Sequence, residues 1–292
     1  MICASCGTDN RSTARFCRVC GGSLLSTQAT GSNHHAALPV IACETSEGQV
    51  RELDEDSLLI LNFTAICEGK GRPDLQFLAV ADGIGGHAAG EVASRLALHQ
   101  LAASIFDLVF TPMAHGANLT CDQLRPLLTQ SVLAANNAVN AEKQRSGQSC
   151  GCTLTCALIH RPQVLVANVG DSRTYHLNGG KLEQVSRDHS VIFELIASGA
   201  ITPEEAKVHP QRHVINRSLG DSASISVDTF DFIIQPGDKI MLCCDGLWEK
   251  VDQSVLEKTL LTETPDGSCQ QLVSLANKNG GEDNISIIVA AY

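Results

Sequence analysis

The sequence predicts an α+β fold built in layers, and two observations support this. Short apolar segments with strand periodicity are grouped together, and the long helical segments lie apart from them instead of alternating with them one by one. The composition is that of a packed globular protein, because 43% of the 292 residues are hydrophobic and 18% are charged. A chain of this length holds one large domain or two unequal ones.

The first residues predict a small zinc-binding unit. The segments CASC and CRVC form two closely spaced cysteine pairs, each followed by a glycine. Two such pairs are typical of a four-thiolate zinc site, and a unit this short needs the metal in order to fold. We therefore predict a zinc ribbon over residues 1–24 with one structural Zn²⁺, acting as a docking or regulatory module. Its predicted ligands are Cys3, Cys6, Cys17 and Cys20.

A linker and a large domain follow. Residues 25–39 are rich in Ser, Thr, Gly and Ala, which is typical of a linker, and residues 40–292 continue without another one. In the large domain, LLILNFTAIC and LQFLAVAD predict paired strands, and residues 90–110 predict a long helix. A second helix is expected to begin near Asp122, which we assign as its cap.

The second half of the domain returns to strands. TLTCALIH, QVLVANVG and RTYHL predict a run of short strands. Residues 190–220 predict a polar, helical insertion in which Thr202 and Glu205 form a capping box, with Pro203 as the first helical residue. ISVDTFDFII and DKIMLCC predict further strands, residues 252–278 predict two helices, and NISIIVAAY predicts the last strand.

Four aspartates occupy similar positions beside the predicted strands. LAVADGIGG and IMLCCDGLWE share an apolar strand followed by Asp-Gly, which relates Asp82 to Asp245. Asp171 follows a strand, and Asp283 precedes one. Strand ends are rigid, so these carboxylates can converge, and grouped carboxylates require a cation. Oxygen ligands of this kind favour Mg²⁺ or Mn²⁺ over Zn²⁺.

The glycines after Asp82 admit another interpretation. A glycine-rich turn between a strand and a helix is typical of dinucleotide binding. That pattern does not place an acid directly before its first glycine, and Asp82 would repel a phosphate unless a cation lay between them. The segment therefore predicts a metal site. In RELDED, which we assign to the first strand, Arg51 adds a planar guanidinium suited to binding phosphate.

Residues 51–289 resemble the PPM family of metal-dependent serine/threonine protein phosphatases, also called type 2C, in its bacterial form. The matching segments, in the family's order, are RELDEDS, ADGIGGHAAGE, GCTLTCALI, VANVGDSRTYHL, SRDHS, HPQRHVINRSLG, PGDKIMLCCDGLWE and GGEDNISIIV. The resemblance implies a four-layer α-β-β-α sandwich of two antiparallel sheets flanked by helices, with the metals at one end between the sheets. The layers predicted above agree with this architecture.

The resemblance also implies a set of metal ligands. Asp82 would bridge two Mn²⁺ or Mg²⁺ ions, and the Gly83 carbonyl would bind one of them. Asp245 and Asp283 would bind the other. Asp171 with Asp245 would hold a third, weaker metal, as in bacterial relatives.

The implied activity is hydrolysis of phosphoserine and phosphothreonine on proteins. Glu55 and Asp56 would orient metal-bound waters, one of which is activated between the metals and attacks phosphorus in line. Arg51 would stabilise the charge on the phosphoryl oxygens. The substrates implied are proteins phosphorylated by a bacterial serine/threonine kinase.

One departure from the family leaves the proton donor open. Animal members carry a histidine directly after the first Asp-Gly, whereas this chain has Ile84 there and His87 three residues later. His87 either protonates the leaving oxygen through water or only orients the loop. The polar insertion matches the family's flap. Its residues His209, Arg212 and Arg217 either contact the phosphoprotein or hold the flap down.

Two other function classes compete with a phosphatase. A catalytically silent scaffold could bind phosphoproteins through the same fold, but Asp82, Asp245 and Asp283 are all intact. A nucleic-acid-binding regulator could act through the ribbon, yet the formal net charge of −11 opposes general attraction to nucleic acid or to anionic membranes. No stretch approaches the roughly 18 apolar residues of a membrane span, and MICASCGTDN lacks signal-peptide features. We therefore expect a cytoplasmic protein.

Overall fold

The computed structural model falls into two units, Met1–Leu38 and Pro39–Tyr292, which are treated separately below. It describes residues 2, 7–11, 18–19, 39–63, 66–67, 70–71, 75–85, 89–206 and 208–292. In the first unit, Ile2 and Asp9 form an antiparallel bridge. The predicted zinc ligands Cys3, Cys6, Cys17 and Cys20 lie outside the described residues.

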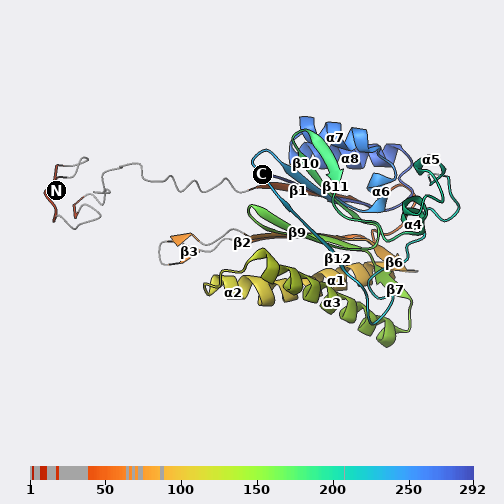
Figure 1. The fold of residues 1–292 in the computed structure, drawn as a ribbon, viewed down its shortest axis with the longest axis horizontal. Helices are drawn as coiled ribbons and strands as arrows, with labels where there is room; N and C mark the ends of the chain where they lie inside the picture. Colours follow the sequence, from red (N-terminus) through yellow and green to blue (C-terminus); the bar gives the residue numbers. More distant parts are fainter. Residues whose placement is uncertain are drawn as a thin grey trace. The chain divides into compact units, whose positions relative to one another are not determined.

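Two antiparallel five-stranded sheets form the middle of the second unit (Figure 1). Sheet I consists of β1 (Val40–Ser46), β10 (Arg173–Asn178), β11 (Lys181–Gln184), β13 (Lys239–Cys243) and β14 (Ile285–Ala291), in the order β1-β14-β13-β10-β11. Sheet II consists of β2 (Ser57–Phe63), β5 (Leu75–Ala81), β8 (Leu154–His160), β9 (Gln163–Val169) and β12 (Asp228–Ile233), in the order β12-β9-β8-β5-β2. Two short pairs complete the strands: β3 (Ile66–Cys67) with β4 (Lys70–Gly71), and β6 (Gly83–Gly85) with β7 (Cys150–Cys152).

Helices cover the outer face of each sheet and complete four layers (Figure 1). On the side of sheet II lie α1 (Ala89–Ile105), a π-helical turn η1 (Phe106–Phe110), α2 (Thr111–Ala114) and α3 (Cys121–Ser146). On sheet I lie α7 (Gln253–Thr262) and α8 (Pro265–Lys278), and α6 (Asp245–Trp248) directly follows β13. The insertion contains α4 (Val191–Ala197) and α5 (Pro203–Ala206). The predicted α-β-β-α sandwich is confirmed.

The interior strand β5 explains why a continuous apolar run forms a strand here. Its side chains alternate between two cores, so that Phe77 and Ala79 pack toward the helices of sheet II. Leu78 and Val80 pack into the layer between the sheets. Because both faces are covered, every position is buried, as in strands enclosed on both sides. Each large apolar side chain buried in this way contributes roughly 1.5–3 kcal/mol. This core holds the strand ends rigidly.

The helix α3 begins in a different way from the prediction. Asp122 was expected to cap it, and this is wrong, because α3 begins at Cys121 and its N-cap is Thr120. Thr120 and Gln123 form a capping box, in which the Thr120 backbone N–H donates to Gln123 Oε1 at 3.0 Å. Thr followed three residues later by Gln satisfies two free N–H groups, whereas Asp122 in the first turn serves the helix dipole.

Within the described residues, the helical stretch Ala89–Ala114 is long and apolar enough to span a membrane by length and composition alone. In this fold it is a core helix. Leu101 and Ile105 are fully buried, and α1 packs against α3 and the strands beside it. Core packing accounts for its hydropathy.

Candidate metal centre

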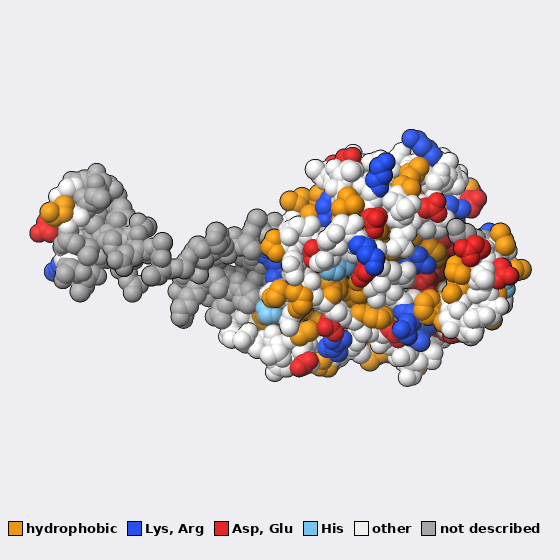
Figure 2. All heavy atoms as spheres, turned by 45° about the horizontal axis from the view of Figure 1, so that its top comes forward, with side chains coloured by type: hydrophobic (Ala, Val, Ile, Leu, Met, Phe, Trp, Pro, Cys, Tyr) orange, Lys and Arg blue, Asp and Glu red, His pale blue; other side chains and the backbone are white. Residues whose placement is uncertain are grey.

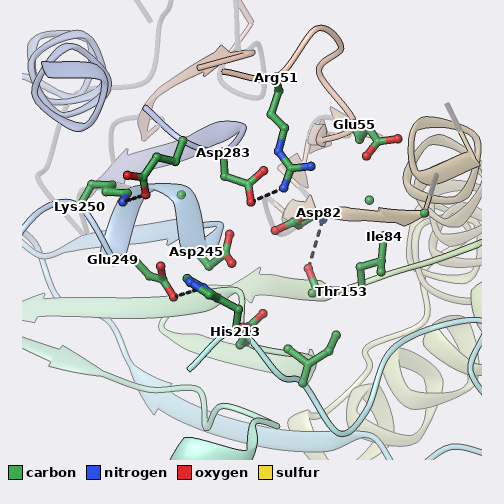
Figure 3. Close-up of a pocket in the computed structure, with 16 residues that line it drawn as sticks. Arg51, Glu55, Asp82, Ile84, Thr153, His213, Asp245, Glu249, Lys250 and Asp283 are labelled. Carbon is green, nitrogen blue, oxygen red and sulfur yellow. Dashed lines mark hydrogen bonds and ion pairs between the residues drawn. The ribbon is translucent and has the colours of Figure 1, made fainter. Parts of the chain in front are cut away.

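A pocket of about 480 Å³ lies at one end of the two sheets, where strands of both sheets finish (Figure 3). Its walls come from the β1–β2 loop, the β5–β6 turn, the β9–β10 turn, α6 and the segment before β14. The predicted residues that line it are Arg51, Glu55, Asp82, Gly83, Asp171, Asp245 and Asp283. The structure therefore brings together side chains from both halves of the large unit.

The two Asp-Gly pairs lie where backbones approach most closely. Asp82 follows the buried strand β5, and Asp245 follows the buried strand β13. A Cβ atom added to Gly246 would lie 2.0 Å from the Asn284 carbonyl oxygen. One added to Gly83 would lie 2.5 Å from backbone atoms of the β1–β2 loop and of α1. Glycine after each aspartate is thus required by close packing of the neighbouring loops, which places the two carboxylates side by side.

Burial and mutual repulsion raise the pKa values of the pocket carboxylates. Burial raises the pKa of Asp82 well above its ordinary value, and the charges of Asp56 and Asp245 add to this. Burial also raises the pKa of Asp245, with Asp283 as the next cause, and that of Asp171, with Asp245 as the next cause. Burial raises the pKa of Asp56 to about 8. Ionising all of them together requires a compensating positive charge.

Several carboxylate oxygens of this group have no hydrogen-bond partner. Within the described part of the chain, both side-chain oxygens of Asp56 and Oδ1 of Asp245 are buried and unpartnered. Asp82 is held by its backbone, because its N–H donates to Thr153 Oγ1 at 3.1 Å and its carbonyl accepts from the Thr153 N–H at 2.8 Å. These two bonds fix the backbone that carries the Asp82 carboxylate. Clustered buried oxygens of this kind fit hard divalent cations such as Mn²⁺ or Mg²⁺.

Arg51 and Glu55 lie in the loop between β1 and β2, so the assignment of RELDED to a strand is wrong. The segment is a run of charged residues without the apolar alternation that a paired strand needs. Arg51 Nη2 donates to Asp283 Oδ2 at 2.8 Å, and this bond is the main cause that raises the pKa of Arg51. The Glu55 N–H donates to Asn284 Oδ1 at 2.9 Å. These bonds tie the loop to the segment before β14.

One group in the pocket was not predicted from the sequence. His213, Asp245 and Glu249 each offer a ligand atom, and these atoms lie within 4.8 Å of one another. His213 Nδ1 lies 3.1 Å from Glu249 Oε1 (Figure 3). Burial, followed by the charge of Asp245, raises the pKa of Glu249. Asp245 and Glu249 are four residues apart and lie on one side of a helical turn, a spacing that the sequence contains. His213 belongs to the insertion, so its position beside Glu249 depends on how the insertion folds back onto the pocket.

The insertion between residues 190 and 220 is anchored at its base. Ser190 and Ile215 form an isolated bridge, and the predicted capping box of α5 is confirmed by the Thr202 N–H, which donates to Glu205 Oε2 at 2.8 Å. Arg217 Nη1 donates to Asp228 Oδ1 at 2.9 Å and to His189 Nε2 at 3.0 Å. Arg217 is therefore bonded to the body of the unit.

The other predicted residues near the pocket separate into two groups. His209 is half-buried and Arg212 is exposed, and neither belongs to the described lining of the pocket. His87, the candidate proton donor, lies outside the described residues. Ile84, which stands where animal relatives carry a histidine, lines the pocket. Lys250 and Glu282 form an ion pair at the pocket rim, which the sequence analysis also did not single out.

Comparison with known proteins decides the family. Residues 44–192 match the family described as Protein phosphatase 2C. The serine/threonine phosphatase stp of Listeria innocua is 33% identical over 248 residues, which cover 84% of this chain and 92% of that protein. The chain belongs to the protein phosphatase 2C family.

Solved structures agree with this assignment to the protein phosphatase 2C family. The crystal structure of the Mycobacterium tuberculosis serine/threonine phosphatase PstP/Ppp has 33% sequence identity and a TM-score of 0.74, and the match covers 87% of this chain and 98% of that one. The structure of the catalytic domain of PstP in complex with two manganese ions has 31% identity and a TM-score of 0.70, with 87% and 98% covered. Both relatives are titled serine/threonine phosphatases.

Proposed function

We propose that this protein phosphatase 2C chain hydrolyses phosphoserine and phosphothreonine on proteins in a metal-dependent reaction. The observation that carries the proposal is the convergence of aspartates from both sheets in one pocket, where Asp171 is buried, Asp82 and Asp245 are half-buried, and the buried Oδ1 of Asp245 has no hydrogen-bond partner in the described part of the chain. A binding scaffold that needs no cation gains nothing from this group, because buried and mutually repelling carboxylates destabilise a fold.

The proposed ligands of two divalent cations, Mn²⁺ or Mg²⁺, are Asp82, Gly83, Asp245 and Asp283. The carboxylates of Asp82, Asp245 and Asp283 would hold the cations, and Gly83 would contribute its backbone carbonyl. The manganese ions of the related PstP structure support this choice of metal. When bound, the cations polarise the phosphoryl oxygens and acidify a coordinated water. Asp171 and Asp245 are the proposed ligands of a third cation, beside which His213 and Glu249 converge.

The remaining roles belong to the chain's own side chains. Glu55 and Asp56 accept hydrogen bonds from water in the site and so orient it. Arg51 is proposed to exchange its bond to Asp283 for one to the substrate phosphate, because a cation at Asp283 neutralises its present partner. A planar guanidinium that faces the pocket from its rim suits the spread charge of a phosphoryl group in the transition state. His87 is the candidate that protonates the leaving oxygen through water or orients its loop.

The substrates are proposed to be proteins phosphorylated by a serine/threonine kinase in the bacterial cytoplasm. The first unit is proposed to be a zinc ribbon that docks a partner or regulates the enzyme. The spacing of the two cysteine pairs in the sequence supports this proposal. Acidic and basic side chains are interspersed on the face shown in Figure 2, which favours a protein substrate over a general polyanion.

The test measures phosphate release from a phosphothreonine peptide with and without millimolar Mn²⁺. Asp245→Asn is expected to lower turnover by roughly 100-fold or more, because the site loses a carboxylate on which charge stabilisation depends. The matched control is Asp231→Asn on β12, which removes a surface ion pair with Arg125 of α3 and should have little effect. Folded, Mn²⁺-loaded wild-type protein without turnover would favour the alternative, a catalytically silent phosphoprotein-binding scaffold.

A further inference from the structure

Trp248, the single tryptophan of the chain, connects two of the turns that carry pocket aspartates. It is the last residue of α6, three positions after Asp245. Its Nε1–H donates to the backbone carbonyl of Asp171 at 3.0 Å. One side chain thus spans from the helix that carries the first carboxylate to the β9–β10 turn that carries the second.

The indole ring is itself held in place. The guanidinium carbon of Arg173 lies 3.4 Å from the centre of the Trp248 ring, in cation–π contact. Asp188 binds that guanidinium through Nε at 3.0 Å and through Nη2 at 2.6 Å, and Nη1 donates to Tyr175 Oη at 3.1 Å. The side chain of Asp188 is only 6% exposed. This buried network restricts the ring and therefore directs its N–H at the Asp171 carbonyl.

The turn that receives this bond crosses from one sheet to the other. It joins β9 of sheet II to β10 of sheet I, so the position of Asp171 depends on how the two sheets meet. Ser172 Oγ lies 2.7 Å from Thr153 Oγ1, and the Gly170 N–H donates to His189 Nδ1 at 3.0 Å. These bonds hold the turn to its surroundings on either side of Asp171. The bond from Trp248 fixes the position of the turn relative to α6.

That relation matters because Asp171 and Asp245 repel each other. The charge of Asp245 is the second cause, after burial, that raises the pKa of Asp171. A turn free to relax would move the two carboxylates apart. A cation shared between them needs both oxygens at roughly 2.0–2.6 Å from its centre, a narrow tolerance for side chains on different elements.

We propose that Trp248 is a positioning residue, which holds the Asp171 carboxylate at the separation from Asp245 at which one divalent cation binds both. The inference rests on the proposed function, since it concerns the proposed third cation site. Trp248 would contact neither substrate nor cation, and it would set the occupancy of the site by positioning Asp171.

The test compares Trp248→Phe with the wild-type protein. Phenylalanine keeps a ring beside Arg173 and lacks the N–H. The matched control is Gln253→Met, which removes another side-chain bond to a backbone carbonyl, from Gln253 Nε2 to Leu182 at 2.9 Å, between residues that do not line the described pocket. Mn²⁺ is titrated into each metal-free, full-length protein by calorimetry, and the melting temperature of each metal-free protein is measured by circular dichroism.

Trp248→Phe is expected to weaken the lowest-affinity class of Mn²⁺ sites roughly fivefold to tenfold, the effect of one lost hydrogen bond, and to leave the tighter sites within about twofold. Its metal-free melting temperature should match that of the control. Because Trp248 is the only tryptophan, wild-type emission should change over the Mn²⁺ range that fills the weakest class, with Trp248→Phe as the blank. This readout needs no variant to fold.

Three results would overturn the inference. The first is a Trp248→Phe isotherm that equals that of the wild type, and the second is an equal weakening of all Mn²⁺ sites together with lower metal-free stability. The third is wild-type tryptophan emission that does not change when Mn²⁺ is added. Phosphate release is measured in the same samples. Wild-type protein that neither binds Mn²⁺ nor releases phosphate overturns the proposed function. Active wild-type protein with an unchanged Trp248→Phe isotherm overturns the positioning role alone.

Discussion

Burying an ionised carboxylate raises the free energy of the folded state, and this explains why the carboxylates of the pocket bind a proton or a cation. Asp56 and Asp82 are surrounded by protein, and each raises the free energy of the other in the ionised state. Both side-chain oxygens of Asp56 are buried and have no hydrogen-bond partner among the described residues. A side chain in such a position holds either a proton or a cation. Which of the two it holds should depend on pH.

The stability of metal-free protein is therefore expected to fall as pH rises. The pKa values of these acids are higher in the folded state than in the unfolded state. The folded state therefore binds more protons than the unfolded state from about pH 4 up to about pH 8, the pKa of Asp56. Below this window the folded state keeps its protons and loses nothing. Above it, the ionised carboxyls destabilise the fold. Melting temperatures in chelator, measured from about pH 5.5 to about pH 8, should decrease, and Mn²⁺ should raise them most at the alkaline end.

The variant Asp56→Asn provides the control for this pH dependence, because the amide cannot ionise. Its metal-free melting temperature should vary less with pH than that of the wild type. A wild-type melting temperature that rises across the same window without metal would contradict the assignment of these carboxyls as buried and mutually repelling.

At the scale of elements, the insertion between residues 190 and 220 depends on a few bonds at its base. Its two helices are short, and the residues of α4 are at most half-buried, so little apolar packing holds it. Arg217, near the end of the insertion, forms an ion pair with Asp228 at the start of β12. The Asn216 backbone N–H donates to the His189 carbonyl and closes the base of the insertion. Such a segment opens locally more easily than the sheets.

Arg217→Leu is expected to speed thermolysin cleavage within residues 190–220 roughly fivefold to tenfold, because the half-buried ion pair and its hydrogen bonds are lost and the open population rises. Cleavage sites and rates are read by mass spectrometry. Arg212→Leu changes an exposed arginine of the same segment and should cleave at the wild-type rate. Equal rates for both variants would show that Arg217 does not anchor the insertion.

At the scale of the whole molecule, the chain consists of two units of very different size. The large unit has its own three-part core, with one layer between the sheets and one under each set of helices. The pocket lining comes entirely from the large unit. Chemistry in the pocket should therefore be independent of the first unit.

Cys17→Ser is expected to remove zinc from the purified protein and to leave hydrolysis of a small aryl phosphate within about twofold of the wild type, because no residue of the first unit lines the described pocket. Zinc content is measured by plasma mass spectrometry and hydrolysis by absorbance. Loss of small-substrate hydrolysis in this variant would mean that the division into a ribbon and a catalytic domain is wrong.

Much of the fold and site could be predicted from local sequence. A strand buried on both faces needs an apolar run, and a carboxylate at its end followed by glycine is a short-range pattern, so Asp82 and Asp245 were identifiable as related before any contact was known. The capping box of α5 is equally local. The placement of RELDED in a strand failed because the loop is shaped by partners far along the chain, such as Asn284.

Most of the helices and strands and the candidate acids could be predicted from the order of residues, since both follow from short-range patterns along a few turns or strands. The contacts of His213 with Glu249 and of Trp248 with the Asp171 carbonyl could be found only in the folded chain. These contacts join residues 36 and 77 positions apart. No local pattern encodes them, because they depend on how the two sheets stack and on where the insertion folds back.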